Sequence, residues 1–141
     1  MPEKSNPKMS ADLALLMSKL EGEPIAAFLN IKVLTLSPGY AKVSMKMRPE
    51  YINFNGVIFG SIIMAIADYA FALAINSLSL PSLATQFNIH LLAPAAAEDE
   101  LTAEGKVLHS GRRTGVTEMT VFNQEGKLVA TATGTSVAPI A

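Results

Sequence analysis

The sequence predicts an α+β domain in which a mostly antiparallel sheet wraps around one long buried helix, with short helices near the N-terminus. The main observation is a run from residue 60 to about 78 with apolar residues on every side of a helix, which is typical of an element buried all round. Other segments show strand composition or period-two alternation. The last of these segments follow one another across short breaks, which favours hairpin pairing for some of them.

The first thirty residues are expected to form two short helices. Ser10 can cap a helix whose apolar positions end at Leu20. Pro24 suits the first turn of a second helical stub that reaches about Asn30, because proline is tolerated where the backbone N–H has no helical acceptor.

The strands are predicted from composition, alternation and turn residues. Branched residues predict a strand at 31–36, and the alternation of apolar and polar residues at 41–48 predicts a half-exposed strand that Pro49 ends. A loop at 50–59 leads into the long helix, and Pro81 closes the connection after it. Further strands are expected at about 84–92, 100–109, 113–123 and 127–137.

Composition fits one ordered domain over all 141 residues, with the first nine flexible. Half of the residues are hydrophobic and 16% are charged, so more apolar surface is expected than a monomer usually shows, which favours a homo-oligomer. The net charge of -1 and the absence of a basic run make nucleic acid and anionic membrane poor partners.

Several site and location classes are disfavoured by the residues present. There are no cysteines, which excludes disulfides and thiolate zinc sites and fits a reducing, cytoplasmic compartment. The N-terminus shows no apolar signal-peptide core, and the apolar run is too short to span a bilayer. The two histidines, His90 and His109, are too few for a metal site, so no metal and no separate cofactor are expected.

Asp68 is the residue that points most strongly to a function. It is the only carboxylate between Ile62 and Leu78. An ionised aspartate in an apolar setting needs donors, water or a substrate, and such settings shift a pKa in ways that catalysis uses.

The loop before the helix supplies a second candidate feature. Gly56 and Gly60 let the backbone approach a ligand closely, and free N–H groups at a helix N-terminus suit an oxyanion. A loop that simply needs small residues to pack remains the alternative. Asp68 lies eight residues after Gly60, roughly 12 Å along a helix axis, so the two groups of one chain do not easily reach one carbonyl. If both act on one substrate, we expect Asp68 to meet a Gly60 from another subunit.

The ordered motifs resemble the hotdog-fold acyl-CoA thioesterases, specifically the phenylacetate-degradation type. The resemblance covers about residues 28 to 138. It rests on Asn53, Gly56, Phe59-Gly60-Ser61 and Ala67-Asp68, followed by Phe87-Asn88-Ile89-His90-Leu91-Leu92-Ala93-Pro94, Leu108-His109-Ser110-Gly111-Arg112-Arg113-Thr114 and Glu125-Gly126-Lys127-Leu128-Val129-Ala130.

The resemblance implies hydrolysis of acyl-CoA thioesters, with coenzyme A as part of the substrate, by a homodimer or a dimer of dimers. Asp68 resembles the acid that acts as nucleophile or as the base that activates water. Gly60 resembles the N–H donor to the thioester carbonyl, from the neighbouring subunit, and Asn53 the side chain that positions the carbonyl or the water. Substrate contacts are expected from Gly56, Phe59, Ser61, Thr85 and Arg112.

Two departures from the family pattern keep a second function open. Phe59 stands where many relatives have histidine, and a phenyl ring cannot donate a hydrogen bond. Ala84 stands where some relatives have a serine or threonine that orients water, and the adjacent Thr85 should point to the opposite face of the strand. The alternative is therefore a non-catalytic module of the same fold that binds acyl-CoA or another acyl ligand. Ser61, in place of a second glycine, can cap the helix.

Overall fold

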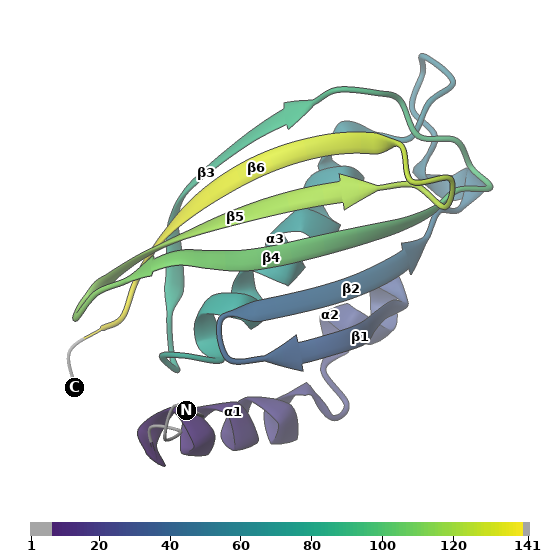
Figure 1. The fold of residues 1–141 in the computed structure, drawn as a ribbon. Coiled ribbons are helices and arrows are strands. Elements are labelled where there is room, and N and C mark those ends of the chain that lie inside the picture. Colours follow the sequence, from purple (N-terminus) through teal and green to yellow (C-terminus); the bar gives the residue numbers. More distant parts are fainter. Residues whose placement is uncertain (1–6, 140–141) are drawn as a thin grey trace.

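The computed structural model describes residues 7–139 and has the expected α+β architecture (Figure 1). The elements follow the predicted order, with boundaries within a few residues of those expected. They are α1 Pro7–Leu20, α2 Pro24–Leu29, β1 Ile31–Ser37, β2 Tyr40–Lys46, the 3-10 turn η1 Pro49–Tyr51, α3 Gly60–Asn76, β3 Leu83–Leu91, β4 Glu100–Ser110, β5 Thr114–Phe122 and β6 Leu128–Val137.

The strands form a six-stranded antiparallel sheet in the order β1-β2-β4-β5-β6-β3. The sheet curves around α3, which confirms the hotdog arrangement (Figure 1). The helix packs mainly against β4, β2 and β5, in the middle of the sheet. The side of the sheet formed by β6 and β3 is therefore less covered by α3, and β3 lies at an edge.

Close approach between α3 and the sheet depends on glycine. A Cβ added at Gly105 in β4 would lie 2.5 Å from the backbone oxygen of Ala70, so the helix backbone packs directly on the strand there. A Cβ at Gly134 in β6 would lie 2.7 Å from the ring of Phe71, a side chain that is itself only 1% exposed. Glycine at these positions sets the depth at which α3 lies in the sheet.

One face of α3 is open in the single chain, which corrects the expectation that the helix is buried all round. Ile63, Ile66 and Ala67 are buried against the sheet, whereas Ser61 and Asp68 are exposed. The open face also carries half-buried small or apolar residues, Met64, Ala65 and Ala72. These residues made the helix look buried from composition alone, and they leave an apolar face that the sheet does not cover.

The N-terminal helices differ from expectation in one detail. The helix predicted to begin at the Ser10 cap begins at Pro7 instead, whereas Pro24 does occupy the first turn of α2. The expected flexibility of residues 1–6 lies outside the described residues, and Pro7 to Met9 belong to α1. Within the described part of the chain, no helix has both the length and the hydropathy needed to cross a bilayer.

Candidate active site

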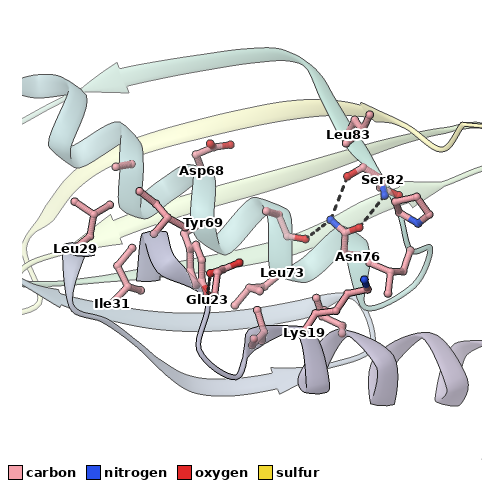
Figure 2. Close-up of a pocket in the computed structure, with 17 residues that line it drawn as sticks. Lys19, Glu23, Leu29, Ile31, Asp68, Tyr69, Leu73, Asn76, Ser82 and Leu83 are labelled. Atoms are coloured by element: carbon pink, nitrogen blue, oxygen red, sulfur yellow. Dashed lines mark hydrogen bonds between the residues drawn. The ribbon is translucent and has the colours of Figure 1, made fainter. Parts of the chain in front are cut away.

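Asp68 lies on the open face of α3, at the wall of a cavity with a volume of about 610 Å³ (Figure 2). Its side chain is exposed in the single chain. Partial burial nevertheless raises the pKa of the Asp68 carboxyl above its ordinary value, with no opposing ion pair or hydrogen bond among the causes. The exposed area of Asp68 allows a substrate to reach the carboxylate. The raised pKa indicates that the surroundings of the carboxylate solvate its charge poorly.

The cavity is formed where α1, α2 and the start of β3 meet α3. Leu16 comes from α1 and Leu29 from α2, and Leu83 begins β3. Tyr69, next to Asp68, points toward the N-terminal segment and donates a hydrogen bond of 2.7 Å to Oε1 of Glu23 (Figure 2). Burial and the Glu23 carboxylate together raise the pKa of the Tyr69 phenol, so Tyr69 stays a neutral donor.

Gly60 begins α3 at a different hollow of about 300 Å³, which it lines together with Asn53 and Leu91. No hydrogen bond of the described residues uses the Gly60 N–H, as expected for the first residue of a helix. A Cβ at Gly60 would lie 2.8 Å from Cδ1 of Leu91, so a larger residue would crowd this N–H. The Gly60 N–H therefore has no hydrogen-bond partner among the described residues, and its residue lines the hollow.

Asn53 and Gly56 belong to one tight turn. Oδ1 of Asn53 accepts a hydrogen bond of 3.0 Å from the Asn55 N–H, and the Gly56 N–H bonds to the Asn53 carbonyl. The Asn53 amide nitrogen remains available as a donor at the hollow that Gly60 lines. Gly56 has φ of +78°, which favours glycine, and it is exposed in the turn. The role that the structure shows for Gly56 is to form this turn.

Asp68 and Gly60 of one chain line separate cavities. Eight residues of helix separate them, about 12 Å along the axis. The structure therefore agrees with the geometric expectation that one chain does not bring these two groups onto a single carbonyl.

The remaining expected substrate contacts are dispersed. Phe59 and Ser61 flank Gly60 and are exposed, and α3 has no side-chain cap, so the expected Ser61 cap is absent. The Thr85 hydroxyl donates to the Thr135 carbonyl at 3.2 Å, beside an irregularity in β3. Arg112 is exposed in the β4–β5 turn, at the end of the sheet opposite the loop before α3 (Figure 1).

Sequence reasoning missed the partners of the Asp68 cavity. Glu23 and Tyr69 are 46 residues apart and meet only through the fold. Asn76 accepts a hydrogen bond from the Ser82 N–H at 2.7 Å and donates to the carbonyls of Ala72 and Ser82, which braces the turn after α3. A polar residue at the end of an apolar helix was the available signal for this brace.

The raised pKa of Asp68 predicts a stability effect with a definite sign. Because the folded state holds the proton more tightly than the unfolded state, the stability from Asp68 is complete below the unfolded-state pKa and is lost as the pH rises through the folded-state pKa. Asp68→Asn, which cannot ionise, should therefore unfold at an equal or higher temperature than wild type near neutral pH. The difference should shrink in acid, as thermal unfolding across this pH range can measure. The prediction is wrong if Asp68→Asn is less stable than wild type at neutral pH but not in acid.

The comparisons with known proteins agree with this architecture. The sequence model of the thioesterase superfamily matches residues 55–130. The acyl-coenzyme A thioesterase PaaI of Escherichia coli K12 is 35% identical over 116 residues, covering 82% of this chain and 83% of that protein.

Two solved structures extend the similarity to three dimensions. The structure of E. coli PaaI, from the phenylacetic acid degradation operon, has a TM-score of 0.85 at 32% identity and covers 95% of this chain and 96% of that one. A hypothetical thioesterase of Streptococcus pneumoniae TIGR4, solved with coenzyme A, has a TM-score of 0.80 at 29% identity and covers 87% of this chain and 96% of that one.

Proposed function

The chain belongs to the thioesterase superfamily as a PaaI-like hotdog hydrolase of thioesters, and we propose that Asp68 and the Gly60 N–H of the partner subunit perform its hydrolysis of acyl-CoA. The observation that carries this assignment is Asp68 itself. It is a solvent-accessible carboxylate with a raised pKa at the wall of a large, mainly apolar cavity.

Thioester hydrolysis needs a polarised carbonyl and an activated nucleophile. As a base, the Asp68 carboxylate takes a proton from water as the water oxygen bonds to the carbonyl carbon. As a nucleophile, it bonds to that carbon itself and forms an anhydride that water then cleaves. In both cases negative charge develops on the carbonyl oxygen, the Gly60 N–H donates to it, and the C–S bond breaks to release coenzyme A thiolate.

We infer that a second copy of the chain completes each site. The open face of α3 carries Asp68 among small and apolar residues, and the adjacent edge strand β3 is largely exposed, with Leu83 58% and Leu91 49% exposed. A copy that covers this face would remove apolar area from water and place its own Gly60 near Asp68. Asn53, beside Gly60, would then donate from the same partner subunit to the carbonyl or the attacking water.

The proposed function is tested by a hydrolysis screen across short, medium, long and aromatic acyl-CoAs. Release of free coenzyme A thiol is followed for wild type and for Asp68→Asn. The proposal is supported if wild type hydrolyses at least one acyl-CoA and Asp68→Asn does not. Wild-type protein that hydrolyses none of them would overturn it.

The assembly predicted for this site is at least a homodimer. Light scattering at the assay concentration should give twice the chain mass or more, because a single chain keeps Asp68 and Gly60 in separate cavities. A fully active monomer would contradict the shared site.

Phe59→His is predicted to leave the fold intact and to maintain or raise turnover. The Phe59 side chain is 53% exposed beside Gly60, so the exchange of one ring for another disturbs little packing, and histidine adds a donor near the carbonyl. kcat and circular dichroism measure the two parts of the prediction. If wild type and Phe59→His are both inert with every acyl-CoA yet are stabilised by these ligands in a thermal shift, a binding module replaces the enzyme.

A further inference from the structure

The lining of the Asp68 cavity is mainly hydrocarbon. Its apolar side chains come from α1, α2, β1, α3 and the turn that leads to β3, and they are Leu16, Leu20, Ile25, Leu29, Ile31, Ala65, Ala72, Leu73, Leu80, Pro81 and Leu83. A cavity of about 610 Å³ falls within the range of small-molecule sites. Coenzyme A, with its amides and phosphates, would lose hydration here without gaining partners, whereas an acyl chain would gain from burial.

Most polar side chains of the lining already have partners inside the protein. Asn76 is engaged by both its oxygen and its nitrogen, and the Ser82 hydroxyl donates to the Ser79 carbonyl. Glu23 accepts from Tyr69. Lys19 is exposed and can keep its ammonium in water. A ligand deep in this cavity therefore meets mainly hydrocarbon, and the exposed Lys19 is the one cation among the lining residues.

Small residues leave a path along the helix beside Asp68. Ala65 and Ala72 stand three residues before and four residues after Asp68, so all three share one face of α3. The path ends where Asn76 is braced against Ser82, about 12 Å from Asp68 along the helix axis. Tyr69, held by Glu23, bounds it on the side of the N-terminal segment (Figure 2).

We propose that this cavity holds the acyl group and makes the chain selective for uncharged acyl groups of medium length, with Ala72 and Tyr69 as specificity-determining residues. The inference rests on the proposed acyl-CoA hydrolysis and adds the substrate class to it. Chain length matters because each buried methylene is worth about fourfold in binding, until the path ends at Asn76. Charge matters because a carboxylate at the far end of the chain would lose hydration against hydrocarbon, with the exposed Lys19 as the one cation of the lining.

The first test compares kcat/KM for acetyl-, octanoyl-, suberyl- and palmitoyl-CoA. Octanoyl and suberyl groups have the same length and differ in a terminal carboxylate. Octanoyl-CoA should exceed suberyl-CoA by at least ~30-fold and should also exceed acetyl- and palmitoyl-CoA. Equal rates for the octanoyl and suberyl thioesters would overturn the proposal.

The second test changes the cavity in opposite directions. Ala72→Leu fills the path and should lower the octanoyl-to-acetyl ratio of kcat/KM at least ~10-fold, whereas Tyr69→Ala widens the wall and should raise the palmitoyl-to-octanoyl ratio. The matched control is Ala14→Leu, which adds the same side chain to an exposed position of α1 outside the lining. If neither Ala72→Leu nor Tyr69→Ala changes these kcat/KM ratios from the wild-type values, the acyl group does not bind in this cavity.

A binding measurement separates this inference from the proposed function. If wild type hydrolyses no acyl-CoA, the proposed function is wrong. Titration calorimetry with octanoyl-CoA, suberyl-CoA and free coenzyme A still tests whether the cavity binds the acyl group. Tighter binding of octanoyl-CoA than of the other two, weakened by Ala72→Leu and unchanged by Ala14→Leu, supports the acyl site. Equal binding of all three would remove it.

Discussion

Asp68→Asn is expected to lower the turnover of acyl-CoA by at least ~100-fold, because asparagine keeps the shape of the side chain and removes its ability to take a proton or form an anhydride. Asp68 is the only carboxylate of α3, so no neighbour on the helix can replace it. In wild type the activity should rise with pH through the raised pKa of Asp68, since the ionised form is the reactive one. Release of coenzyme A thiol measures both effects.

The matched control is Glu104→Gln. Glu104 lies on β4, outside the cavity lining, and its nearest cation is Lys42, with Nζ 4.0 Å from Oε1. Such a partly exposed pair contributes little to stability. Glu104→Gln should therefore retain wild-type turnover. Asp68→Asn with unchanged turnover, or both variants losing it equally, would end the assignment of Asp68 as the reactive group.

The order and approximate bounds of the elements were predictable because each depends on local signals. Alternation predicted a strand at 41–48, and β2 spans Tyr40–Lys46. The continuous apolar run predicted a helix from 60 to about 78, and α3 spans Gly60–Asn76. Turn residues marked the breaks between the later strands, so their ends also agree closely.

The open face of α3 was not predictable, because small and apolar residues look the same whether their own sheet or another chain covers them. Ala67 is buried on the side of α3 that faces the sheet, whereas Ala65 and Ala72 line the cavity at the open face. Periodicity distinguishes a polar face from an apolar one, and here both faces are largely apolar. Only the position of the sheet shows which face is left uncovered.

The surroundings of Asp68 were only partly predictable for a different reason. The lone carboxylate in an apolar run indicated a perturbed group, and its pKa is indeed raised by burial. Its neighbours come from distant parts of the chain, as the bond between Glu23 and Tyr69 shows. Pairing of side chains so far apart depends on tertiary packing, which no local pattern encodes.

Gly105→Ala is expected to be the most damaging small change in the sheet. The added Cβ would lie 2.5 Å from the backbone oxygen of Ala70 and 2.8 Å from its carbonyl carbon. Backbone atoms inside a helix cannot move alone, so α3 must shift away from β4. Overpacking of this kind typically costs 1–3 kcal/mol, and contact with backbone places this site at about 3 kcal/mol. Urea unfolding followed by circular dichroism measures the loss.

Gly115→Ala provides the comparison that isolates the backbone contact. Its added Cβ would approach two side-chain ends, Cδ1 of Ile75 at 2.7 Å and Oγ of Ser136 at 2.9 Å, whereas the backbone oxygen of His109 lies farther off, at 3.3 Å. The loss there should be about 1 kcal/mol. Equal losses in the two variants would show that α3 can adjust to β4 without strain.

The Gly105 variant also connects the packing of the sheet to the site. Ala70 lies two residues after Asp68, so a shift of α3 at Ala70 moves the carboxylate relative to the cavity wall and to the proposed partner subunit. A displacement of about 1 Å can cost ~100-fold in rate. Gly105→Ala should therefore lose kcat under conditions where circular dichroism shows it fully folded, whereas Gly115→Ala should lose stability alone. Full activity in folded Gly105→Ala would mean that the site tolerates a shift of the helix that carries it.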